Sequence, residues 1–291
     1  MLSSPRHAPP KRWGEHIATL AVALLSWGSI AILAGIIGFL VYRGGQVLSW
    51  EFLTAPMREG MQKGGIAPAL VGSLWLTAVA ILTAAFISTA AGAYLSEFAR
   101  PSRFKNLIEF LVTTLAGIPS VVYGLFGLAL FVTALGLGAS ILAGGLTLAL
   151  LSLPLLIRNA QEAFAAVPRA LKEASLGIGA SEIQTFFRIT LPMALPRILT
   201  GLVLASGRVL GETAPILFTV AAYYLPTYPH SLLEPTMALP YHLYVLITSG
   251  TNIQATYPMA FGTALVLLLL TLCLTGIAAY LRYRLKKSYR V

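Results

Sequence analysis

The sequence predicts an all-α polytopic membrane protein with six transmembrane helices and both termini in the cytoplasm. Of its 291 residues, 57% are hydrophobic and 10% are charged, whereas soluble domains contain about 25% charged residues. Long uncharged stretches recur along the chain, and about 20 helical residues suffice to cross the hydrocarbon core of a bilayer. Lysine and arginine concentrate between alternate stretches, as they do in cytoplasmic loops.

The first span is the uncharged stretch 17–42, which follows a basic cytoplasmic tail at 1–16. A cleaved signal peptide is the alternative, but its apolar core would have only about 7 to 15 residues. The loop 43–63 then lies outside the cell. We expect one domain with five further helices over 64–282, followed by a basic cytoplasmic tail at 283–291.

The other five helices follow from the remaining uncharged stretches. The second helix lies within 64–96, while the stretch 110–157 is 48 residues long and must turn back once, at the glycine-rich segment 136–140. Helix five is predicted after Arg197 and up to about Tyr223, and helix six over 257–281.

Pro119 lies within the predicted third helix. A proline there leaves the carbonyl of Leu115 without its usual donor and is expected to kink the helix. Ordinary curvature of a bundle helix is the alternative.

The positive charges support this topology. Of the twenty lysines and arginines, sixteen fall in segments assigned to the cytoplasm, three fall outside, and Arg208 falls within a span. The net charge of +10 is therefore explained by membrane orientation and by contact with anionic lipid, with no need for nucleic acid.

The sequence contains no motif for binding a nucleotide or a metal ion. No G-x-x-x-x-G-K-[ST] phosphate loop occurs, so we expect this chain not to bind ATP by itself and expect no cofactor in it. The single Cys273 excludes an intrachain disulfide. His230 and His242 lie in the outer loop, where an interfacial structural role is favoured over a metal site, and we expect neither a metal site nor catalytic residues.

A mostly polar segment, 173–192, interrupts the apolar stretches within the cytoplasmic loop 161–196. A short helix over about 170–176 is followed by a turn at Gly177 and Gly179. Ser181 and Gln184 have the spacing of a capping box that starts a second helix, which Pro192 is expected to stop. The loop is predicted to be a helix, a glycine turn and a second helix.

This segment resembles the cytoplasmic docking loop of ABC-importer permeases. The matching positions are Glu173, Ala174, Ser175, Gly179, Ile189, Leu191 and Pro192, with Ser175 in place of a second alanine. The resemblance implies that the first helix docks in a cleft of a separate ATPase subunit and transmits its motion. The alternative is an amphipathic loop that only caps the bundle.

Arg208 and Glu212 are the full charges placed deep within a predicted span. Buried charges in a membrane usually pair or face a pathway, and residues four apart share one helix face. We therefore expect Arg208 to pair with Glu212 and to exchange this partner for a passing anion, with a purely structural ion pair as the alternative. Arg158, near the cytoplasmic end of helix four, is a second pathway candidate or a cytoplasmic anchor.

Two strings, GRVLGETAP at 207–215 and PSVVYGLF at 119–126, resemble permeases of the bacterial phosphate-specific importer, above all its PstA-type subunit. The resemblance implies a type I ABC importer permease fold, a place in the bacterial inner membrane and a peripheral first helix. It also implies phosphate as substrate. The implied partners are a PstC-type permease, a PstB-type ATPase dimer that binds ATP and magnesium, and an extracytoplasmic phosphate-binding protein. Sulfate or molybdate import is an alternative, and a secondary transporter or channel is another.

The outer loop 224–256 is rich in tyrosine and proline and contains no lysine or arginine. The family resemblance implies a docking surface for the binding protein, and aromatic anchoring at the membrane interface is the alternative. Its segment 237–249 is apolar enough to lie in the interface or to enter the bundle.

Overall fold

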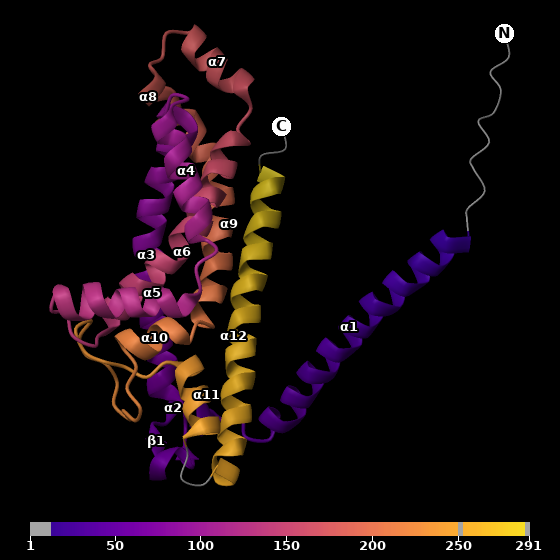
Figure 1. The fold of residues 1–291 in the computed structure, drawn as a ribbon, viewed down its shortest axis with the longest axis vertical. Coiled ribbons are helices and arrows are strands. Elements are labelled where there is room, and N and C mark those ends of the chain that lie inside the picture. Colours follow the sequence, from indigo (N-terminus) through magenta and orange to yellow (C-terminus); the bar gives the residue numbers. More distant parts are fainter. Residues whose placement is uncertain (1–12, 250–252, 289–291) are drawn as a thin grey trace.

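Five long apolar helices dominate the structure, a computed structural model that describes residues 13–249 and 253–288 (Figure 1). They are α1 (Trp13–Gly45), α3 (Ala67–Ala93), α6 (Ile141–Ala165), α9 (Leu191–Leu210) and α12 (Ile253–Ser288). Each is long and apolar enough to cross a membrane, and one bent helix pair brings the possible spans to six. The polytopic all-α class predicted from hydropathy is confirmed.

Both predicted tails extend beyond the described residues, and their described parts are helical. Helix α1 begins at Trp13 and α12 continues to Ser288, while 1–12 and 289–291 lie outside the described residues. Residues 169–192, which we call the docking segment, lie at the same end of the bundle as the C-terminal end of α12 (Figure 1).

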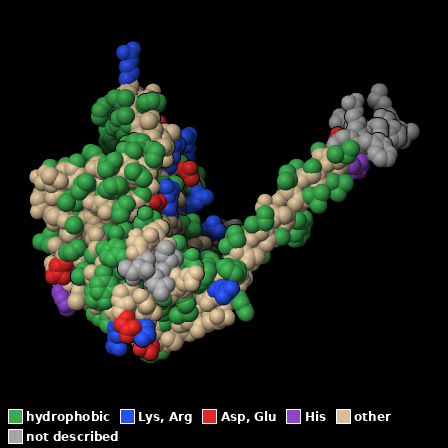
Figure 2. All heavy atoms as spheres, turned by 60° about the horizontal axis from the view of Figure 1, so that its bottom comes forward, with side chains coloured by type: hydrophobic (Ala, Val, Ile, Leu, Met, Phe, Trp, Pro, Cys, Tyr) green, Lys and Arg blue, Asp and Glu red, His purple; other side chains and the backbone are tan. Residues whose placement is uncertain are grey.

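Helix α1 stands apart from the bundle, and its C-terminal end makes the contact. Gly44 packs so closely on α12 that a Cβ atom would lie 2.6 Å from the carbonyl oxygen of Phe261, and the rings of Phe39 and Phe261 meet edge to face at 5.5 Å. The rest of α1 exposes apolar side chains along its length, as the face seen in Figure 2 shows. The expected peripheral place of helix one agrees with this arrangement.

A short folded segment joins α1 to α3. It contains α2 (Trp50–Thr54), whose N-terminus is capped by Ser49, and an antiparallel pair of two-residue strands, β1 (Met57–Arg58) and β2 (Lys63–Gly64). A single turn of 3₁₀ helix, Glu59–Met61, connects the strands. Phe52 of α2 is buried against Gly262 of α12, so this segment fixes one end of the bundle.

The third predicted helix is broken rather than kinked. Helix α4 (Arg103–Leu115) and the segment 120–134, which comprises α5 (Ser120–Gly127) and a π-helical continuation, meet at 104°. Pro119 occupies the N-cap position of α5 in an extended conformation. The Leu115 carbonyl, expected to lack its donor, accepts from the Tyr123 hydroxyl at 2.9 Å and from the Ile118 N–H at 3.2 Å.

The break leaves α5 lying across the bundle (Figure 1). The chain then turns at 136–140 as predicted, with left-handed backbone at Gly136 and Gly138 and with Ser140 capping α6.

The predicted bounds of helix five are wrong at both ends. The helix runs without interruption from Glu182 to Leu210, 29 residues, and ends there instead of continuing to Tyr223. Pro192 does not stop it. A π-helical stretch, Phe186–Thr190, precedes the proline, and the Leu191 N–H donates to the Phe186 carbonyl five residues back. This wider turn makes room for a residue that has no N–H of its own.

Candidate functional site: the docking segment and the helix break

The docking segment has the predicted order of helix, turn and helix. Helix α7 spans Arg169–Gly177 and α8 spans Glu182–Thr185. Gly179 between them has φ +88°, a left-handed conformation that glycine adopts without steric cost. The Ser181–Gln184 capping box is present, with hydrogen bonds of 3.2 Å and 3.0 Å.

Ser175, the one departure from the motif, has a structural reason. Its side chain is buried, and its hydroxyl lies 2.9 Å from the hydroxyl of Thr185. An alanine at 175 would leave the buried Thr185 hydroxyl without this bond. The serine therefore ties α7 to α8.

The remaining motif residues divide into two groups. Glu173, Ala174 and Gly179 are exposed on α7 and its turn, whereas Ile189 and Leu191 are half-buried where the second helix enters the bundle. Pro192 is exposed beside them.

The docking segment also exposes large apolar side chains, which are Leu171, Leu176, Ile178, Ile183 and Phe187. Ile178 is 88% exposed. These apolar side chains are spread over α7, the turn, α8 and the π-helical stretch. Exposed apolar surface of this kind is typical of protein or membrane contact sites.

Arg208 lies in the last turn of α9, and Glu212 lies just beyond the end of this helix. The Arg208 Nε atom is 3.6 Å from a Glu212 carboxylate oxygen, so the predicted pairing is confirmed. Its predicted basis is wrong, because Glu212 is not on a helical face shared with Arg208: the helix stops at Leu210, and α10 (Ala214–Thr219) starts after a short break. The Arg208 side chain is 57% exposed, and that of Glu212 is 18% exposed.

The break after Leu210 packs against the other broken helix. A Cβ atom on Gly124 of α5 would lie 2.9 Å from Phe218, 3.0 Å from the Cα of Pro215 and 3.2 Å from the Ala214 carbonyl. The two sequence strings that carry the resemblance therefore meet in space, at the point where both helices are interrupted. Sequence analysis identified each string but not their contact, because nothing in the spacing of either string refers to the other.

Arg158 is exposed on α6 and donates a hydrogen bond to the Thr113 hydroxyl of α4. It lines a cavity of about 390 Å³ at the side of the bundle, between α4 and α6, together with Lys105, Glu109 and Gln161. No ion pair or hydrogen bond joins Arg158 to Arg208 or Glu212 in the described residues. The structure thus brings Arg208 and Glu212 together, whereas Arg158 lines a cavity that neither of them lines.

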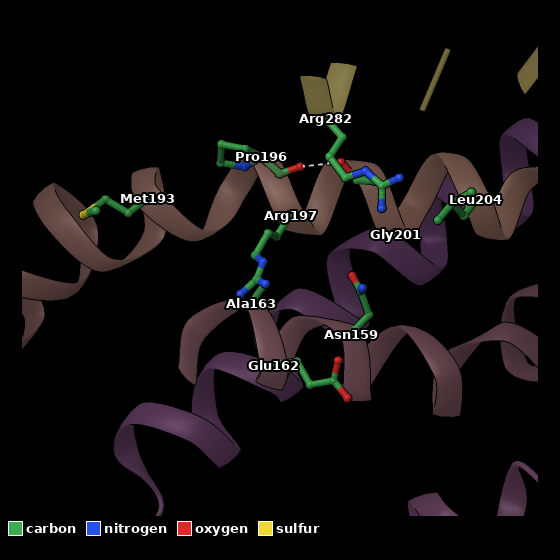
Figure 3. Close-up of a pocket in the computed structure, with 10 residues that line it drawn as sticks. Asn159, Glu162, Ala163, Met193, Pro196, Arg197, Gly201, Leu204 and Arg282 are labelled. Carbon is green, nitrogen blue, oxygen red and sulfur yellow. Dashed lines mark hydrogen bonds between the residues drawn. The ribbon is translucent and has the colours of Figure 1, made fainter. Parts of the chain in front are cut away.

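Sequence analysis missed a larger cavity, of about 580 Å³, between α6, α9 and α12 (Figure 3). Arg197 and Arg282 line it, and both had been counted only among the cytoplasmic charges. Asn159 and Glu162 of α6 complete its polar wall. The sequence signal is the helical spacing of Met193, Arg197, Gly201 and Leu204, which places these residues on one face of α9.

The outer loop contributes α11 (Leu239–Thr248), which enters the bundle. Its Leu239 N–H donates to the Ser73 hydroxyl of α3 at 2.7 Å. The His242 side chain of α11 is fully buried, and neither ring nitrogen has a hydrogen-bond partner among the described residues. No group of three or more His, Cys, Asp or Glu residues in the described parts of the chain could hold a metal ion.

Residues 88–287 match the family described as binding-protein-dependent transport system inner membrane components. The chain is also 34% identical to the probable phosphate transport system permease protein PstA of Methanocaldococcus jannaschii over 291 residues, all of both chains. The chain belongs to the PstA-type permease family. It is 34% identical to PstA of Haemophilus influenzae, over 86% of this chain and 88% of the relative, and 32% identical to the probable ABC transporter permease YqgI of Bacillus subtilis, over 81% and 84%.

Solved structures show that this PstA-type permease has the type I ABC importer permease fold. A chain of a bacterial alginate ABC transporter matches with a TM-score of 0.67 at 17% identity, covering 94% of this chain and 95% of that one. A chain of the MetNI methionine ABC transporter matches with a TM-score of 0.58 at 17% identity, covering 79% and 99%. The likeness in both cases is in the fold, and the predicted architecture is confirmed.

Proposed function

We propose that this permease is the membrane-spanning subunit of an ATP-driven importer of inorganic phosphate. The observation that carries the proposal is Arg208, which is more than half exposed at the end of a membrane helix and paired with Glu212. A charge in that position is costly unless it is paired or meets a polar pathway. Its chemistry suits an anion that enters and leaves.

Arginine recognises phosphate through a planar fork of donors, and it stays protonated at any working pH. The 3.6 Å separation of Arg208 and Glu212 is longer than a good charge-assisted hydrogen bond. An arriving oxyanion can therefore replace the carboxylate as the partner of the guanidinium. When the anion leaves, Glu212 again neutralises Arg208.

The position of Arg208 near the end of α9 also allows motion of the docking segment to reach it. Helix α9 starts in the docking segment and ends at Arg208's turn, so a displacement of α7 and α8 reaches the pathway residue along one continuous helix. In the proposed cycle, closure of the ATPase pushes the docking segment and reorients the cavity between outward and inward access. In this cycle Arg158 acts as a second pathway residue on the exit side.

The partners in this proposal are a PstC-type permease, a PstB-type ATPase dimer that binds ATP and magnesium, and an extracytoplasmic phosphate-binding protein. The exposed apolar residues of α7 and its turn supply a surface for the ATPase. The curated PstA relatives support phosphate as the substrate, and the family description supports a place in the inner membrane. The docking segment and the end of α12 then face the cytoplasm.

The test is ATP-dependent uptake of labelled phosphate into vesicles that contain this chain with its permease and ATPase partners, challenged with excess sulfate. We expect uptake that sulfate does not inhibit, loss of uptake in Arg208→Gln, and partial retention in Arg208→Lys. Arg58→Gln, an exposed arginine of the β1–β2 hairpin, is the matched control. Competition by sulfate would overturn phosphate as the substrate, and normal uptake by Arg208→Gln would overturn the pathway role.

A further inference from the structure

One face of α9 connects Arg208 to the large cavity. Met193, Arg197, Gly201 and Leu204 all line the cavity, at intervals of four, four and three residues. Arg208 follows Leu204 by four residues and therefore continues the same face. Arg197 and Arg208 are eleven positions apart, which corresponds to about 16 Å along the helix axis, so the cavity lies between Arg208 and the docking segment.

The cavity walls have a net positive charge. Arg197 of α9 and Arg282 of α12 line it together with a single carboxylate, Glu162 of α6. In the described part of the chain, neither guanidinium makes a hydrogen bond or an ion pair with another residue. Both groups are thus available to an incoming anion.

Asn159 adds a neutral polar group to the same cavity, and Gly201 makes room for it. A Cβ atom at 201 would clash with the Asn159 side-chain amide. Figure 3 shows the Asn159 side chain pointing from α6 toward Gly201, and Arg197 pointing from α9 toward α6. An amide N–H₂ can donate to an anion oxygen, so three helices supply donors to one space.

We propose that this cavity is a second site for a phosphate oxyanion, held by Arg197, Arg282 and Asn159, on the way from Arg208 to the docking-segment end. The proposal rests on the proposed function of the chain, since it extends the pathway beyond Arg208. Glu162 has here the place that Glu212 has beside Arg208, a carboxylate that offsets the arginines while the site is empty. Two such sites on one helix face let the anion pass from one guanidinium group to the next without being released into an apolar environment.

Protection of a cysteine tests the site without transport. In the assembled complex with Cys273→Ser, Leu204→Cys places a thiol in the cavity wall, and Leu199→Cys places one on another face of α9 at similar exposure, 41% against 47% for Leu204. We expect inorganic phosphate to slow maleimide labelling of Leu204→Cys and not of Leu199→Cys. Adding Arg197→Gln and Arg282→Gln should raise the half-protecting phosphate concentration about tenfold or more.

Arg284→Gln is the matched control, because Arg284 lies two residues from Arg282 and stacks on Tyr280, 5.7 Å from its centroid. It should leave protection unchanged. Absence of protection in the parent variant, or equal protection with both arginines replaced, would overturn the proposal. Phosphate uptake tests the proposed function separately. Arg208→Gln should abolish uptake, whereas Arg208→Gln added to the Leu204→Cys variant should leave the protection of this cysteine by phosphate intact.

A phospholipid headgroup has the same chemistry and could fill the cavity from the membrane. Labelling is therefore repeated without phosphate in nanodiscs of phosphatidylcholine alone and of phosphatidylcholine with phosphatidylglycerol. Equal labelling in the two supports the free anion. Protection by phosphatidylglycerol together with none from inorganic phosphate would assign the cavity to lipid and overturn its role in the pathway.

Discussion

The Lys172 ammonium group lies 2.8 Å from both carboxylate oxygens of Glu97, which joins α7 to the π-helical continuation of α3, Tyr94–Phe98, across 75 residues of sequence. The two side chains are only 20% and 16% exposed. Surface ion pairs contribute about 0 to 1 kcal/mol, whereas a buried pair costs about 3 to 5 kcal/mol when one partner is removed. We therefore expect this largely buried pair to stabilise the packing of the docking segment against the helical stretch Tyr94–Phe98.

Lys172→Ala should loosen that link and lower the phosphate transported per ATP hydrolysed several-fold, while ATP hydrolysis persists. The measurement is the ratio of uptake to hydrolysis in vesicles. The exchanged pair Lys172→Glu with Glu97→Lys should recover part of the ratio. Lys63→Ala, which breaks an exposed pair with Glu59, should leave it unchanged; a normal ratio in Lys172→Ala would show that the pair does not transmit motion.

Gly179 sets the direction of the chain between α7 and α8. Gly179→Ala should cost about 1 to 2 kcal/mol in the free energy of unfolding, because the residue has φ +88°. Gly179→Asp should also place a charge on the surface that we propose as the ATPase contact, and should abolish coupling. Membrane insertion and the fold should be kept, since a Cβ at 179 meets nothing within 4 Å and the backbone strain is the only cost.

Gly177→Ala is the control for this position. Gly177 is also in open space, but its backbone is not left-handed. Uptake is expected to be near normal. Normal uptake in Gly179→Asp would remove the docking role from the segment.

Gly124 holds the two broken helices together. Gly124→Val should push α10 away from α5, because Phe218, Pro215 and the Ala214 carbonyl already lie within 3.2 Å of the Cβ position. Overpacking of this kind costs about 1 to 3 kcal/mol, so both the unfolding midpoint in detergent and uptake should fall. Gly117→Ala, which meets only Thr114 at 3.5 Å, should be tolerated, and equal behaviour of the two variants would contradict the packing argument.

Tyr123 closes the gap left by Pro119. Tyr123→Phe removes the hydroxyl that donates to the Leu115 carbonyl, and we expect a loss of about 0.5 to 1.5 kcal/mol in the free energy of unfolding. Denaturation of the purified chain in detergent measures it. Tyr228→Phe, whose exposed hydroxyl bonds the Thr54 carbonyl at 3.1 Å, should have a smaller effect; a larger one would show that the helix break does not depend on Tyr123.

Sequence analysis predicted the local structure of the docking segment well because its signals are local. The capping box at Ser181 and the turn at Gly179 depend on residues only a few positions apart, and both are present. Pro192 misled the same analysis, since the preceding π-helical stretch lets the helix continue past it. The missed cavity depends on Arg197 and Arg282, which are 85 positions apart in the sequence.

The sequence by itself determined the membrane class, five of the long apolar helices and the docking motif. In a bilayer each spanning segment must satisfy its own backbone hydrogen bonds, so hydropathy over a single stretch is enough to find it. Only the tertiary structure decided where helices break and which charges meet. A freed carbonyl such as that of Leu115 is satisfied by the side chain of Tyr123, and Lys172 is held by Glu97 from another helix; such partners become neighbours only when the helices pack.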